Sequence, residues 1–122
     1  MTLRILAVDD SRTMRDMLTI ALTGAGMEVT VAEDGVHGLE MLEAEEVPDA
    51  IISDINMPRL DGFGFIEAVR RIDRFRATPI LVLTTESAPE LKARARNAGA
   101  TGWIVKPFDP QKLVRSIHMV TG

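Results

Sequence analysis

The chain contains no cysteine, and this absence removes two classes of protein from consideration. Without thiols there is neither a disulfide framework nor a thiolate metal site, so zinc fingers are excluded. No apolar run approaches the length of about 18 residues that a membrane helix requires. The first residues, 1–4, lead directly into a strand-like segment and carry no signal-peptide pattern. We therefore expect a cytoplasmic protein with no membrane insertion.

The sequence also has no excess of positive charge, of glycine or of proline. Its formal net charge is -4 at pH 7, whereas the phosphates of nucleic acids favour basic surfaces, so we expect no direct binding to nucleic acid. A hydrophobic content of 46% with 26% charged residues is typical of a globular protein and not of a disordered one. With 122 residues and no repeats or linkers, we expect residues 1–122 to form one domain with a substantial core.

Short apolar runs alternate with segments of helical period along the whole chain. Five runs are apolar on both faces, as buried parallel strands are. They span residues 3–8, 29–32, 50–53, 79–83 and 102–105. Five predicted helices follow these runs: one capped by Ser11 and ending at 24–26, one each after residues 34–35 and 61–62, one at 90–98, and one after Pro110. This alternation predicts a parallel sheet with helices on both faces.

Charged residues stand where three of the predicted strands end. Asp9 and Asp10 follow the first strand, Asp54 follows the third, and Lys106 follows the fifth. Because the carboxyl ends of parallel strands line the crevice where ligands bind, we expect these side chains to lie close together. Clustered carboxylates repel one another unless a cation joins them, and Mg²⁺ favours oxygen ligands at about 2.0 to 2.1 Å. The sequence therefore predicts phosphate chemistry at a magnesium site.

Each of these residues also has a simpler interpretation. An isolated aspartate such as Asp54 is as well explained by helix capping, but Ser11 already caps the first helix, and adjacent carboxylates need a counterion. A strand-end carboxylate can instead attack a phosphoryl group and form an acyl phosphate. Thr84, at the end of the fourth strand, is able to donate a hydrogen bond to a phosphoryl oxygen. The Lys106-Pro107 bond beside this site is predicted to be cis.

Taken together, these residues resemble the response-regulator receiver domain over essentially the whole chain. The likeness is carried by Val8-Asp9-Asp10, Asp54 with Met57-Pro58 and Asp61-Gly62, Leu83-Thr84, and Lys106-Pro107-Phe108. The resemblance implies an α/β fold, a doubly wound five-stranded parallel (βα)5 sheet with the strand order 2-1-3-4-5. The chain shows no further domain, and so it is similar to the single-domain CheY-type chemotaxis regulators, which implies a monomeric protein of two-component signalling.

The resemblance also implies a role for each site residue. Asp54 would accept a phosphoryl group from a phosphohistidine on a CheA-type histidine kinase, and Thr84 and Lys106 would bind the phosphoryl oxygens. The ligands of Mg²⁺ would be Asp10, Asp54, the backbone carbonyl of Asn56 and, through water, Asp9.

Further positions bear on how long the phosphoryl group lasts and how it is read. Asn56 and Glu86 match the family pattern for rapid loss of phosphate, whereas Thr85 is bulkier than the usual residue and should impede an attacking water. Trp103 occupies the position of the family's aromatic switch, which would remodel the surface formed by the fourth helix, fifth strand and fifth helix. An alternative for Trp103 is a partly buried packing residue.

The expected function is a switch that binds the flagellar motor switch protein, with a separate phosphatase as a candidate partner. The alternatives are a phosphate sink, a relay, a regulator of a kinase, or a receiver cut from a larger protein. We do not expect an enzyme. A haloacid-dehalogenase-type phosphatase is disfavoured because it needs a second acid where this chain has Asn56. A flavodoxin-like binding protein is disfavoured because it needs a phosphate-binding loop after the first strand, where Asp9 and Asp10 would repel a phosphate.

Two groups of basic residues remain. The first lies at the end of the third helix and is interpreted as a solvated helix end that complements the helix dipole. It comprises Arg70, Arg71, Arg74 and Arg76. The second lies on the fourth helix, where a partner contact and a solvated face are equally good interpretations. It comprises Lys92, Arg94 and Arg96.

Overall fold

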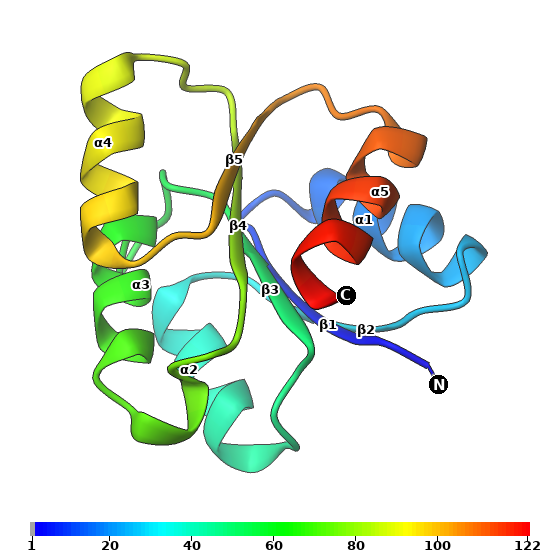
Figure 1. Ribbon diagram of the computed structural model, residues 1–122, viewed down its shortest axis with the longest axis horizontal. Coiled ribbons are helices and arrows are strands. Elements are labelled where there is room, and N and C mark those ends of the chain that lie inside the picture. The colour runs from blue at the N-terminus through cyan, green and yellow to red at the C-terminus, as the bar shows by residue number, and fades with distance from the viewer. Residues whose placement is uncertain (1) are drawn as a thin grey trace.

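Five parallel strands form one sheet in the order β2-β1-β3-β4-β5 in the computed structural model, which describes residues 2–122 (Figure 1). The strands are β1 (Arg4–Val8), β2 (Glu28–Ala32), β3 (Ala50–Ser53), β4 (Ile80–Thr84) and β5 (Gly102–Val105). The helices are α1 (Arg12–Gly24), α2 (Gly35–Ala44), α3 (Gly62–Arg70), the short 3-10 helix η1 (Asp73–Phe75), α4 (Pro89–Ala98) and α5 (Pro110–Thr121). The predicted fold class and strand order are confirmed.

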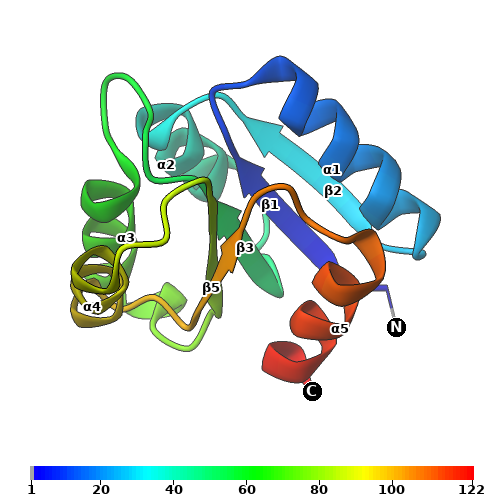
Figure 2. The ribbon, with the colours of Figure 1, turned by 90° about the horizontal axis from the view of Figure 1, so that it is seen from above.

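Helices cover both faces of the sheet. Figures 1 and 2 show α1 and α5 on one face and α2, α3 and α4 on the other. Two apolar cores result, one beneath α1 and α5 around Leu18 and Ile117, the other beneath α2, α3 and α4 around Phe65 and Phe75. The strands read as apolar on both faces because each face of the sheet is buried under helices.

A short polar side chain caps the start of α1, α2, α3 and α5, whereas α4 begins at Pro89 without a side-chain cap. The Ser11 hydroxyl accepts a hydrogen bond from the backbone N–H of Met14, so Ser11 is the N-cap of α1 as predicted. Gly99 ends α4 with φ 117°, a left-handed conformation that favours glycine. Among residues 2–122, no helix combines the length and the apolar character needed to cross a membrane.

The basic segment at the end of α3 differs from the prediction of a solvated helix end. Arg71 and Arg76 are exposed, but the guanidinium of Arg70 is partly buried. It donates hydrogen bonds to the backbone carbonyls of Phe75, Arg76, Thr78 and Gly99. Burial lowers the pKa of Arg70. The prediction is therefore wrong for Arg70, which ties the end of α3 to η1 and to the end of α4.

Candidate functional site

The parallel register places the ends of β1 and β3 side by side. Val8 pairs with Ser53 at the last rung between these strands, and the backbone N–H of Asp54 donates to the carbonyl of Val8 at 3.0 Å. Asp9 and Asp54 are the residues that follow immediately on the two strands. Because the backbone ladder fixes where the two strands end, Asp9 and Asp54 leave the same edge of the sheet side by side.

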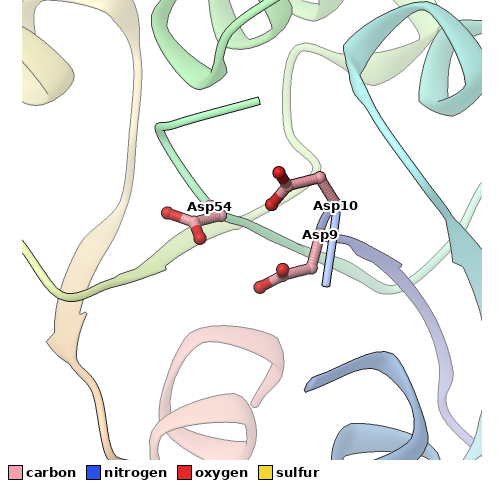
Figure 3. A group of neighbouring side chains, drawn as sticks. All are labelled: Asp9, Asp10 and Asp54. Carbon is pink, nitrogen blue, oxygen red and sulfur yellow. The ribbon is translucent and has the colours of Figure 1, made fainter. Parts of the chain in front are cut away.

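The three predicted acidic residues meet at this edge. Figure 3 shows the side chains of Asp9, Asp10 and Asp54 gathered where β1 and β3 end. Each offers a carboxylate oxygen, and these oxygens lie within 4.8 Å of one another. Asp9 and Asp54 are buried, whereas Asp10 is exposed. The arrangement brings together residues that the sequence predicted as neighbours.

Lys106 bridges the two buried carboxylates from the end of β5. Its Nζ lies 2.6 Å from Asp54 Oδ2 and 2.8 Å from Asp9 Oδ2. Burial lowers the pKa of Lys106, but the hydrogen bonds with Asp54 and Asp9 outweigh it, so the pKa is raised and the ammonium is charged at neutral pH. The pKa of Asp9 is raised because burial outweighs the hydrogen bond from Lys106. The Lys106-Pro107 bond is cis, as predicted.

The donor set fits a hard divalent cation. Three carboxylates and one ammonium leave a formal charge of -2 at the site, which one divalent ion neutralises. Every candidate ligand is an oxygen, and exposed Asp10 leaves one side open for the water molecules that Mg²⁺ usually keeps. Mg²⁺ therefore fits these residues.

The loop from β3 to α3 carries Asn56, the other predicted ligand. The loop is closed by a hydrogen bond from the Gly62 N–H to the Ile55 carbonyl at 2.8 Å. A Cβ atom on Gly62 would lie 2.3 Å from the carbonyl oxygen of Asp54, so only glycine permits this closure. The Asn56 side chain is exposed, and its Nδ2 donates to Glu86 Oε1 at 3.4 Å. The two residues expected to govern loss of phosphate thus face each other.

Thr84 and Trp103 are connected through the backbone of Glu86. Thr84 is fully buried, and its hydroxyl oxygen accepts the Glu86 N–H at 3.4 Å. The indole N–H of half-buried Trp103 donates to the Glu86 carbonyl at 3.0 Å. Thr85, which lies between Thr84 and Glu86 in the chain, is exposed. Trp103 also packs against the core beneath α4, which agrees with the interpretation as a partly buried packing residue. Its role as a switch stays a prediction.

Two residues near the site were not singled out by sequence reasoning. Arg59, in the loop after β3, forms an ion pair with buried Asp34 at the start of α2. The sequence showed Asp34 only as the start of a helix. No local sequence pattern pairs Arg59 with Asp34, because the two residues lie 25 positions apart in the chain.

Comparison with known proteins supports the same family as the motifs. The family described as response regulator receiver domain matches residues 5–118. The chain is 39% identical over 121 residues to the chemotaxis protein CheY1 of Helicobacter pylori, covering 98% of each protein. It also superposes on the structure of the chemotaxis protein CheY4 of Vibrio cholerae with a TM-score of 0.93 and 45% identity, covering 98% of this chain and 99% of that one.

A third relative bears on the metal. The receiver domain of the sensor histidine kinase PA1611 from Pseudomonas aeruginosa has a TM-score of 0.91 and 26% identity, and covers 100% of this chain and 99% of that one. That structure is described with a magnesium ion coordinated in its active site cleft. The chain therefore belongs to the response regulator receiver domain family and is similar over nearly its full length to CheY-type members.

Proposed function

We propose that this protein is a two-component signalling switch in which Asp54 accepts a phosphoryl group from a phosphohistidine on a CheA-type kinase. The observation that carries the proposal is the meeting of Asp9, Asp10 and Asp54 with Lys106 at one sheet edge. Such a site has a nucleophile, a place for a divalent cation and a fixed positive charge, which are the parts that phosphoryl transfer needs.

The carboxylate of Asp54 is held in one orientation before any donor arrives. The Ile55 N–H donates to Oδ1 at 2.6 Å and Lys106 Nζ donates to Oδ2 at 2.6 Å. In the transfer, an Asp54 oxygen forms a bond to phosphorus, the phosphorus–nitrogen bond breaks, and the donor histidine leaves with the bonding electrons. Lys106 is then placed to bind a phosphoryl oxygen, because its ammonium already lies on the attacking carboxylate.

We assign the cation to Asp10, Asp54 and the backbone carbonyl of Asn56, with Asp9 acting through water. When bound, Mg²⁺ neutralises the carboxylates and the oxygens of the incoming phosphoryl group. The same residues explain why turnover on an outside substrate is not expected. The position two residues after Asp54 is Asn56, an amide that cannot act as a general acid, so the protein modifies itself and then hydrolyses the product.

Signal output follows from the connection between Thr84 and Trp103. A Thr84 hydroxyl that turns toward the phosphoryl group alters its contact with the Glu86 N–H, and the Glu86 carbonyl holds the Trp103 indole. Trp103 lies beside a groove of about 230 Å³ whose basic walls are Lys92 and Arg96. We infer that phosphorylation biases the surface of α4, β5 and α5 between two states, one of which binds the output partner.

Chemotaxis is the proposed pathway, because relatives from Helicobacter and Vibrio carry that description. The proposed partner is the flagellar motor switch protein. A fluorescence titration should show that a motor switch peptide binds the phosphorylated protein more tightly than the unmodified one. Equal affinity in both states would favour a phosphate sink or a relay, which need the phosphoacceptor but no output surface.

The phosphoacceptor assignment is tested by intact mass. The protein is incubated with Mg²⁺ and a small phosphodonor, and Trp103 fluorescence is followed in parallel. One phosphoryl adduct is expected, which Asp54→Asn should abolish and the control Asp16→Asn, an exposed carboxylate on α1, should leave unchanged. An adduct that persists in Asp54→Asn would remove Asp54 from its role.

A further inference from the structure

The loop between β3 and α3 is fastened to the start of α2 by one pair of side chains. Arg59 donates from Nε to Asp34 Oδ2 at 2.7 Å and from Nη2 to Asp34 Oδ1 at 3.0 Å. Both oxygens of the carboxylate are engaged, which makes this the two-pronged geometry that an arginine fork forms and a lysine cannot. We call the Asp34–Arg59 pair the loop clasp.

Asp34 is well fixed before Arg59 reaches it. Its side chain is 5% exposed, and Oδ1 also accepts the His37 N–H at 2.9 Å, so Asp34 is the N-cap of α2. The backbone supports the same junction, because the Gly35 N–H donates to the Leu60 carbonyl at 3.2 Å. The loop therefore meets the rigid end of a helix at two successive residues, Arg59 and Leu60.

The backbone conformation of Arg59 is one that residues other than glycine rarely adopt. Its φ is 64°, and it is the only residue other than glycine with positive φ in the described part of the chain, residues 2–122. Glycine or asparagine adopts this conformation more easily than arginine does. A less favourable residue persists here when its surroundings hold it, and the loop clasp supplies that restraint.

We propose that the loop clasp positions the backbone carbonyl of Asn56 for the divalent cation, so that Asp34 and Arg59 are positioning residues of the metal site. This inference rests on the function proposed above. The stretch between the two fixed points is short: Ile55 is bonded to Gly62 at one end, and Arg59 is bonded to Asp34 at the other. Only Asn56, Met57 and Pro58 lie between them. A carbonyl in so short a tether is held nearly in place before the cation binds.

Simple electrostatics predicts a different result from positioning. If only charge mattered, removing Arg59 would strengthen Mg²⁺ binding and removing the charge of Asp34 would weaken it. The loop clasp predicts that both changes weaken binding, because each one frees the loop. The sign of the Arg59 effect therefore separates the two explanations.

The test is calorimetric titration of Mg²⁺ into the purified protein without any phosphodonor. Arg59→Asn removes the fork but tolerates the positive φ, and Asp34→Asn removes the charge but keeps a good N-cap. Each variant should raise the dissociation constant for Mg²⁺ about tenfold, as the loss of a residue that orients a metal ligand does. The double variant should be no weaker than either single one, since both changes break the same contact.

Three controls keep the result interpretable. Arg59→Lys retains the charge without the fork and should also weaken binding. Arg71→Asn removes a guanidinium that follows α3 and is 77% exposed, and it should leave the dissociation constant for Mg²⁺ unchanged. Thermal unfolding verifies that each variant is folded; if Asp34→Asn is not, Arg59→Asn and Arg59→Lys carry the test.

Two outcomes overturn the loop clasp. The first is a dissociation constant that is unchanged in folded Arg59→Asn, and the second is tighter binding by that variant. Failure of the proposed function has a different signature: wild-type protein would show no saturable Mg²⁺ binding, or Asp10→Asn would bind as tightly as wild type.

Discussion

The ammonium of Lys106 lies 2.6 Å from a carboxylate oxygen of Asp54, although the two residues are 52 positions apart in the chain. The same ammonium lies 2.8 Å from Asp9, so one positive charge links β5 to both β1 and β3. The Lys106 side chain is only 11% exposed. If its ammonium were removed, little water could therefore reach the two carboxylates in its place.

Lys106→Met should therefore have opposite effects on stability and on metal binding. Removing one partner of a buried pair should lower the free energy of unfolding by about 3 kcal/mol when Mg²⁺ is chelated. The extra negative charge left at the site should lower the dissociation constant for Mg²⁺ about tenfold, equivalent to about 1.4 kcal/mol. Denaturant unfolding and calorimetry measure the two effects. Lys112→Met, on the exposed side of α5, is the control, and weaker Mg²⁺ binding by Lys106→Met would contradict the prediction.

Asp10→Asn should stabilise the metal-free protein, because Asp10 adds a third negative charge to Asp9 and Asp54. We expect a gain of about 1 kcal/mol, which corresponds to a rise in melting temperature of about 3 to 5 °C. Wild-type protein should instead gain about 2.7 kcal/mol from Mg²⁺ at a hundred times its dissociation constant, and Asp10→Asn should lose this gain. The order of the melting temperatures should therefore reverse: Asp10→Asn should melt above wild type in a chelator and below wild type in Mg²⁺. Asp16→Asn should behave as wild type. An equal stabilisation of wild type and Asp10→Asn by Mg²⁺ would argue against Asp10 as a ligand.

Arg70 and Arg71 are neighbours with very different surroundings. Arg70→Gln should lower the free energy of unfolding by about 2 to 3 kcal/mol, because four backbone carbonyls lose their donor in a partly buried place. Arg71→Gln should change the same quantity by less than about 0.5 kcal/mol, since its guanidinium is exposed. Denaturant unfolding of the two variants makes the comparison. Equal effects would show that the carbonyl contacts of Arg70 add nothing.

Sequence alone was enough to predict the sheet and the acidic edge. The strands are apolar on both faces and separated by helices of clear period, and their ends at Val8 and Ser53 fix where Asp9 and Asp54 meet. Ser11 and Gly99 were recognisable as helix ends because capping is local chemistry. The strand boundaries shifted by one residue in several places, since the pattern does not specify where a backbone ladder stops.

The contacts that sequence could not supply join residues far apart in the chain. Arg70 looked like one of several solvated arginines because its acceptors are backbone carbonyls, which every residue has. Arg59 and Asp34 were missed for a related reason: a loop arginine has many carboxylates within reach, and only the folded loop selects one. Periodicity and capping describe neighbours in the chain, whereas these contacts depend on tertiary packing.

Thr85 gives a prediction about the lifetime of the phosphoryl group. If its bulk impedes an attacking water, Thr85→Ala should raise the rate of loss of phosphate by about threefold. This corresponds to an activation free energy that is lower by about 0.7 kcal/mol. Thr85→Ser keeps the hydroxyl and removes the methyl group, so it should behave as Thr85→Ala does. Loss of the adduct is followed by intact mass after removal of the phosphodonor. A slower loss in Thr85→Ala would mean that the side chain assists the water.

The ion pair of Asp34 gives a prediction about pH. The hydrogen bond from Arg59 lowers the pKa of Asp34 and outweighs the opposing effect of burial. A carboxyl group whose pKa is lower in the folded protein stabilises it fully above the pKa of the unfolded chain, near 3.9, and loses this contribution as the pH falls through the lower folded value. Asp34→Asn has no such group. The difference in unfolding free energy between wild type and Asp34→Asn should therefore be constant from about pH 8 to pH 5 and shrink below about pH 4.

Comparing the two proteins at each pH removes the contribution of Asp9, whose raised pKa acts in the opposite direction and is present in both. Chelator in every sample excludes effects of metal binding. Asp73→Asn is the matched control: its carboxylate pairs with Arg76 at 3.1 Å but is 87% exposed, so solvent screens the pair, and the variant should have the unfolding free energy of wild type within about 0.5 kcal/mol. A difference for Asp34→Asn that stays constant down to pH 3 would show that the Arg59 contact does not favour the ionised form, since pH 3 lies about one unit below the unfolded pKa.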